Sequence, residues 1–131
     1  YDGVKIFDGD LKEFELADVK ILSEKVTLEK GTVNNGGSNI YELATQNGAK
    51  VVMVAENTNN NNKEFFEFGV IDNGTDISHT EYGNVRTGEQ LIVPTFEKTA
   101  SGFARVNFDI GSSVTAGHNV VVTIVSNINK K

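Results

Sequence analysis

The chain has 131 residues, a length that suits one domain and lets folding bury roughly two-thirds of the surface that the unfolded chain exposes. Its 12 basic and 18 acidic side chains give a net charge of -6, which disfavours nucleic acid and anionic membrane surfaces as partners. It has no cysteine, which excludes disulfides and thiolate sites, and no apolar run of about 18 residues, so we expect no membrane span.

Apolar and polar residues alternate over several short windows, as they do in half-buried β-strands. Residues 11–25 contain good helix formers but no sustained apolar stripe, so we favour strands there and keep a helix as the lesser alternative. Residues 50–56 and 120–125 are rich in β-branched residues. Such runs favour central strands that are covered on both faces or sandwiched under a neighbour.

An Asn-Gly pair between two apolar windows is a strong hairpin signal, because both residues tolerate the positive φ of a tight turn. Asn47-Gly48 lies between two such windows. We therefore predict a hairpin that joins residues 40–45 to residues 50–55.

A second Asn-Gly pair, at positions 73–74, predicts a hairpin that joins residues 64–71 to residues 76–82. The same segment places Asp72 and Asp76 around a glycine, in a pattern that resembles part of a calcium loop. It lacks the glutamate that completes an EF-hand loop, so an Asx-type turn is favoured over a calcium site. Asp72 and Asp76 are the candidate calcium ligands under the alternative, and we predict no metal and no cofactor.

Two Asn-rich segments, residues 34–39 and 57–62, predict exposed and mobile loops, because asparagine competes locally for backbone hydrogen bonds. Pro94 lies in an otherwise strand-like stretch and predicts an edge strand or a bulge, since proline donates no ladder hydrogen bond. Residues 103–110 alternate most clearly. There one face of the strand carries Ala104, Val106, Phe108 and Ile110.

The spacing of these windows predicts about eight or nine strands and no βαβ units. We therefore predict an all-β fold in which residues 1–131 form a single antiparallel β-sandwich of the jelly-roll or immunoglobulin-like type.

The chain shows no recognisable catalytic motif. His79 and His118 lack an accompanying nucleophile motif, so both are interpreted as ordinary exposed histidines. Glu64, Glu67, Asp72 and Asp76 cluster around one predicted hairpin, and a charged exposed face is favoured over a catalytic carboxylate pair. We therefore expect that the chain is not an enzyme, and a polysaccharide hydrolase is kept as the third choice.

The stretches Thr87-Gly88-Glu89, residues 101–106 and residues 115–122 have the cadence of small β-rich virion proteins of tailed bacteriophages. The chain resembles capsid decoration proteins and related head or tail accessory domains in this pattern. The resemblance implies a structural protein on the outer surface of a phage head or tail. Such a protein binds the capsid or another virion protein, and self-association into a homo-oligomer is a further option.

Two segments are candidates for partner contact. Tyr1, Val4 and Ile6 begin an alternating segment that would add to a neighbouring sheet edge, although a plain first strand of the same domain is the more ordinary interpretation. The exposed-loop candidates are Asn59, Asn60, Asn61 and Tyr82.

The alternative function is a glycan-binding or adhesion module on a virion or a bacterial surface. Exposed aromatic side chains usually provide the sugar-binding platform, and tryptophan is the strongest. This chain has no tryptophan, and most of its eight phenylalanines are expected in the core. The alternative therefore depends on the loop at residues 57–63 together with Tyr41 or Tyr82.

Overall fold

The structure is a computed structural model that describes residues 13–31, 39–43, 48–98 and 104–129. These residues form antiparallel strands, and no helix occurs among them. The prediction of an all-β antiparallel sandwich is therefore confirmed. The nine strands are β1 (Glu13–Glu15), β2 (Val19–Glu29), β3 (Asn39–Leu43), β4 (Gly48–Asn57), β5 (Lys63–Asp72), β6 (Ile77–Arg86), β7 (Ile92–Lys98), β8 (Ala104–Ile110) and β9 (Asn119–Asn129).

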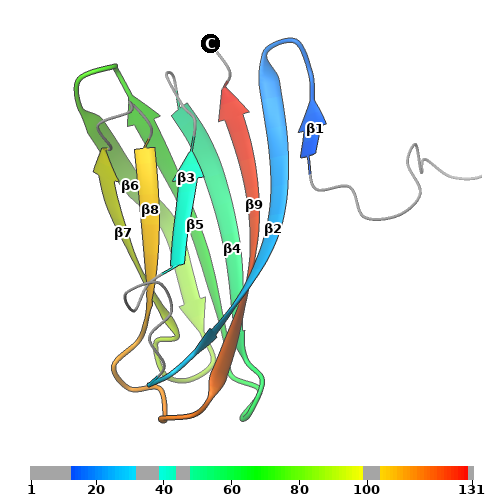
Figure 1. The fold of residues 1–131 in the computed structure, drawn as a ribbon, viewed down its shortest axis with the longest axis vertical. Helices are drawn as coiled ribbons and strands as arrows, with labels where there is room; N and C mark the ends of the chain where they lie inside the picture. The colour runs from blue at the N-terminus through cyan, green and yellow to red at the C-terminus, as the bar shows by residue number, and fades with distance from the viewer. Residues whose placement is uncertain (1–12, 32–38, 44–47, 99–103, 130–131) are drawn as a thin grey trace, which may run out of the picture.

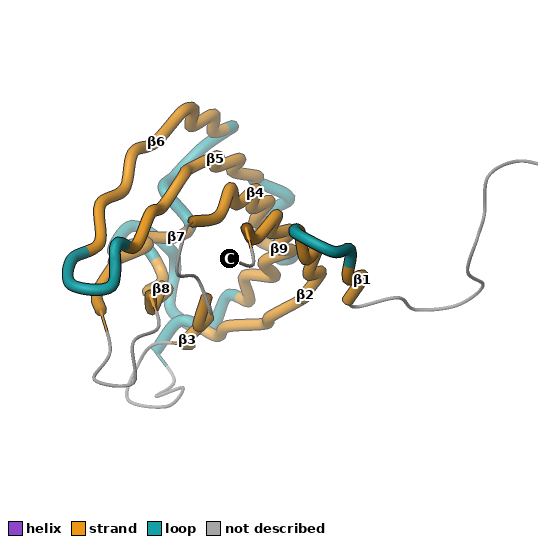
Figure 2. Tube along the Cα trace, turned by 90° about the horizontal axis from the view of Figure 1, so that it is seen from above, coloured by secondary structure: helices purple, strands orange, loops and turns teal. Residues whose placement is uncertain are grey.

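The strands form two sheets (Figure 1). The large sheet has six strands in the order β1-β2-β9-β4-β5-β6, and the small sheet has three in the order β3-β8-β7. Seen from above, the large sheet curves around the small one (Figure 2). One face of the large sheet, which we call the inner face, packs against the small sheet. We call its opposite face the outer face.

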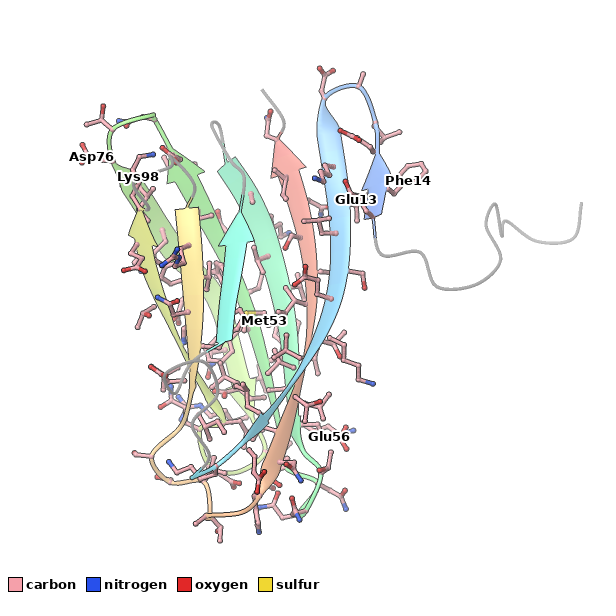
Figure 3. All side chains as sticks on the ribbon, in the orientation of Figure 1. Glu13, Phe14, Met53, Glu56, Asp76 and Lys98 are labelled. Atoms are coloured by element: carbon pink, nitrogen blue, oxygen red, sulfur yellow. The ribbon has the colours of Figure 1, made fainter. Side chains whose placement is uncertain are left out.

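The core lies between the inner face and the small sheet. Val51, Met53 and Ala55 alternate along β4 with no exposed surface, and Figure 3 shows Met53 between the strands of the two sheets. The ring of Phe68 on β5 meets that of Phe96 on β7 edge to face, with centroids 4.9 Å apart. Complete burial of a side chain such as Val51, Met53 or Phe68 stabilises the fold by roughly 1.5–3 kcal/mol.

The prediction that residues 50–56 and 120–125 form central strands is confirmed, but of its two alternatives coverage on both faces does not hold for the described residues. β4 and β9 are central strands, but Val54 is 43% exposed and Val125 is 40% exposed on the outer face. The small sheet covers the inner face alone. The continuous apolar runs therefore reflect β-branched strand preference and not burial on two sides.

The predicted hairpin between residues 40–45 and 50–55 is also wrong. β3 pairs with β8 in the small sheet, whereas β4 pairs with β5 and β9 in the large sheet. The chain thus passes from one sheet to the other between β3 and β4. The second predicted hairpin is confirmed, because β5 pairs with β6 on either side of the turn.

Two further expectations are confirmed in this arrangement. The segment for which a helix was the lesser alternative contributes β1 and part of β2. Pro94 lies on β7, an edge strand of the small sheet.

The described residues contain no helix that is long and apolar enough to cross a membrane.

Candidate functional site

A groove of about 530 Å³ opens in the large sheet, near the end where β9 finishes and β4 begins. Its volume falls within the range of ordinary ligand sites. Five strands, β2, β4, β5, β6 and β9, contribute to the groove. Its side-chain lining on the outer face includes Val19, Lys50, Ile71, Ser78, Thr80, Tyr82, Asn127 and Asn129.

Strand register explains why these residues meet. Partners across neighbouring strands point to the same face of a sheet, so each register row gives one line of side chains. Gly48 on β4 and Gly69 on β5 have no side chain, so the backbone forms the floor of the groove at these two positions. One row contains Val19, Asn129 and Gly48, and Ile71, the partner of Ser78, lies beside Gly48. The next row contains Ile21, Asn127, Lys50, Gly69 and Thr80.

A β-bulge places Tyr82 over this floor. The pairing of β5 with β6 shifts between Glu67 and Phe68, and this shift leaves Tyr82 outside the ladder. The Tyr82 side chain crosses Gly69, so that a Cβ atom on Gly69 would lie 2.8 Å from the phenol oxygen. Tyr82 remains 64% exposed. Bulges commonly re-aim side chains in this way, and here the result is an accessible aromatic ring beside polar groups.

Lys50 supplies a positive charge to the groove. Its Nζ atom lies 2.8 Å from Oε1 of Glu67, and its side chain is 56% exposed. The hydrogen bond to Glu67 raises the pKa of Lys50, and the charge of Glu67 acts in the same direction. Lys50 is therefore protonated at neutral pH. None of the described residues that line the groove is Asp or Glu.

The chemistry of the groove suits a polyhydroxylated ligand. Ser78 and Thr80 carry hydroxyl groups that both donate and accept hydrogen bonds, and the amides of Asn127 and Asn129 do the same. The Tyr82 ring offers an apolar face beside them.

The structure separates the residues that sequence reasoning had grouped. Tyr82 lies at the groove, whereas Asn59, Asn60 and Asn61 lie in the β4–β5 loop at the opposite end of the large sheet (Figure 1). Tyr41 lies on β3 in the small sheet. The contact candidates Tyr1, Val4 and Ile6 lie outside the described residues.

The β4–β5 loop is tied to Glu89. The carboxylate of Glu89 accepts hydrogen bonds from the side-chain amides of Asn57, Asn60 and Asn62. The bond from Asn60, together with those from the other donors, lowers the pKa of Glu89. The loop is exposed at residues 58–61 as predicted, but Asn57 is buried.

The calcium candidates have other partners. Nζ of Lys98 lies 2.6 Å and 2.7 Å from the two carboxylate oxygens of Asp72, and the Gly74 N–H donates to Oδ1. The hydrogen bond from Lys98, followed by that from Gly74, lowers the pKa of Asp72. Asp76 is exposed, and its backbone N–H donates to Asn73 in an Asx-type turn. Figure 3 shows Asp76 and Lys98 at the end of the molecule that carries this turn.

The expectation of an exposed charged face is wrong for Asp72 and Glu64, since both are buried. Glu64 accepts hydrogen bonds from the backbone N–H groups of Leu91 and Ile92, and it pairs with Arg86 at 2.9 Å. Glu64 thereby anchors the crossover from the large sheet to the small one.

The two histidines lie in different surroundings. His79 is exposed, as predicted, and it stacks on Phe96 with centroids 3.9 Å apart. His118 is half-buried, and its Nδ1 atom lies 3.1 Å from Nδ2 of Asn57. The described contact of His118 is therefore with an amide and not with a hydroxyl nucleophile.

The sequence matches no protein-family model and no curated protein. Solved structures with a similar fold include two phage tailspike proteins. The tailspike of Acinetobacter baumannii phage AM24 has a TM-score of 0.50 at 11% identity over 86% of this chain and 26% of that chain. The tailspike of Acinetobacter phage vB_ApiP_P1 has a TM-score of 0.50 at 16% identity over 98% of this chain and 25% of that chain.

These similarities show the fold. This chain spans about a quarter of the length of the two tailspikes, at 26% and 25%. Both tailspikes are phage proteins, which is consistent with the resemblance to tailed-phage virion proteins. Nothing in the comparisons points to capsid decoration.

A third comparison corrects the expectation that the chain is not an enzyme. The tailspike gp49 of Acinetobacter baumannii bacteriophage Fri1 has a TM-score of 0.43 at 18% identity over 87% of this chain and 19% of that chain. It is a capsular polysaccharide depolymerase. The expectation depended on the lack of a recognisable motif, and such an absence does not exclude an enzyme.

Proposed function

We propose that this chain is a virion-associated domain of a phage protein that binds carbohydrate in the groove on the outer face. The observation that carries the proposal is the exposed Tyr82 ring held across Gly69. The apolar face of a sugar ring stacks on an aromatic side chain, while its hydroxyl groups need donors and acceptors at the rim. Thr80 and Asn127 lie in the same register row as Gly69 and supply these groups.

We also propose a location on the tail of the virion. The AM24 and vB_ApiP_P1 chains with this fold are tailspikes. From the hydroxyl, amide and aromatic groups of the groove we propose a bacterial surface polysaccharide as the class of ligand. Capsid decoration remains a prediction without support, because its contact residues Tyr1, Val4 and Ile6 lie outside the described residues.

A glycan array tests the proposal with three forms of the chain. The native chain is expected to bind a defined group of bacterial polysaccharides, and Tyr82→Ala should weaken that binding by roughly five- to tenfold as the stacking contact is lost. Val85→Ala is the matched control, because Val85 is 65% exposed on the same strand and does not line the groove. Absence of any saturable binding by the native chain, or unchanged binding by Tyr82→Ala, would refute the proposal.

A further inference from the structure

We infer that the groove selects a saccharide that carries a carboxylate, and that Lys50 is the residue that recognises it. This inference rests on the proposed function and names the class of sugar. It goes beyond the aromatic platform, since stacking on Tyr82 does not distinguish an acidic sugar from a neutral one.

The charges of the groove lead to this inference. Among the described residues that line the groove, Lys50 carries a formal charge at neutral pH and none is an aspartate or glutamate, while its ion-pair partner Glu67 lies outside the lining. The whole chain carries a net charge of -6, so long-range attraction does not draw an anionic ligand in. A preference for an anionic ligand would therefore depend on short-range contact with the Lys50 ammonium.

The position of Lys50 suits such contact. Lys50 is the register partner of Gly69, the residue that Tyr82 crosses. Lys50 and Tyr82 both line the groove. A sugar ring stacked on Tyr82 would thus have its substituents within reach of the ammonium.

The ion pair with Glu67 leaves Lys50 able to bind a ligand. An ammonium group has three N–H donors, and the described pair uses the contact between Nζ and Oε1 of Glu67. Glu67 is not part of the groove lining. It therefore orients the Lys50 ammonium, while a ligand carboxylate can take another donor. The Glu67 carboxylate also competes with the ligand carboxylate for the positive charge of Lys50.

The test uses the saccharides found on the array, each in its acidic form and in a carboxyl-reduced form in which the carboxylate has become a hydroxymethyl group. Isothermal titration should give about tenfold tighter binding of the acidic form, as expected for a charge-assisted hydrogen bond. Lys50→Gln should abolish this preference and leave the affinity for the reduced form within about twofold. Glu67→Gln should strengthen binding of the acidic form by about threefold, because it removes the competing charge.

Two controls complete the design. Lys25→Gln removes a lysine on the same outer face, from a row outside the groove, and should change neither affinity. Lys50→Arg keeps the charge and should retain the preference, which tests the charge even where Lys50→Gln fails to fold. Equal affinity of the native chain for both forms, or a preference that survives in Lys50→Gln, would overturn the inference and leave the proposed function standing. Absence of binding to every saccharide would refute the proposed function itself.

Discussion

The phenol oxygen of Tyr82 lies 2.8 Å from the point that a Cβ atom on Gly69 would occupy. The two residues lie on adjacent strands, and the bulge in the β5–β6 pairing brings the ring across the glycine. The missing side chain at Gly69 thus provides room for an aromatic ring on an otherwise exposed sheet face.

Gly69→Ala tests this relationship. The added methyl group would meet the flexible end of Tyr82, so the ring should move and the fold should persist, with a change of about 1 kcal/mol or less in the free energy of unfolding. The affinity for the saccharide should fall because the Tyr82 ring is displaced. Urea denaturation and titration calorimetry on the same preparation measure the two effects. Retention of native affinity would show that the position of Tyr82 does not matter for binding.

Gly48→Ala should behave differently, although Gly48 also lies on the groove floor. Its φ is +149°, and an added Cβ would lie 2.8 Å from the backbone carbonyl oxygen of Val70, which cannot turn aside. We expect a loss of roughly 2–3 kcal/mol in the free energy of unfolding. Urea denaturation that showed equal stability for Gly48→Ala and Gly69→Ala would contradict this assignment of strain.

Glu64→Ala should be among the most destabilising single changes. It would leave the buried N–H groups of Leu91 and Ile92 without their acceptor and Arg86 without its partner. We expect a loss of about 3–5 kcal/mol in the free energy of unfolding. The control is Glu56→Gln, because the contact between Glu56 and Lys63 is longer, at 3.9 Å, and exposed. A small effect of Glu64→Ala in chemical denaturation would mean that the crossover does not depend on this carboxylate.

The contact between Asp72 and Lys98 predicts a dependence of stability on pH. The pKa of Asp72 is lowered in the folded chain from its ordinary value of 3.8. Its contribution is therefore fully present above about pH 4, and it is lost as the pH falls through the lowered folded-state pKa. Asp72→Asn should cost about 2–4 kcal/mol at pH 7, and the difference from the native chain should shrink below pH 3.8.

Thermal unfolding followed from pH 7 to pH 2.5 measures this difference. Asp76→Asn is the matched control, since Asp76 is an exposed carboxylate at the other end of the same turn. The native chain and Asp76→Asn should show the same dependence of thermal stability on pH. A gap between the native chain and Asp72→Asn that stayed constant to the lowest pH would show that the ion pair does not stabilise the fold.

The fold could be predicted from the sequence as far as local patterns reach. Alternation located strands such as β8, and Asn73-Gly74 located the β5–β6 hairpin, because both signals act within a few residues. Asn47-Gly48 was misleading for the same reason. A turn signal says that the chain bends, but the partner of β3 is β8, which lies far along the sequence.

The groove could not be predicted, because it depends on register. Gly48 and Gly69 are far apart in the sequence and meet only when β4 pairs with β5. The bulge that re-aims Tyr82 has one weak signal in the sequence, Gly83, because a glycine inside a strand often marks a bulge. Buried Glu64 also had a signal, since it shares strand parity with Phe66 and Phe68, but its charge favoured an exposed position.

Nuclear magnetic resonance titration of the ¹⁵N-labelled chain with an array-identified saccharide tests the central claim most directly. The account predicts saturable shifts of the backbone amide signals of Lys50, Gly69, Thr80 and Asn127, with the signals of residues 58–61 unchanged. Shifts confined to the β4–β5 loop, or none that saturate, would contradict the groove as the site of binding.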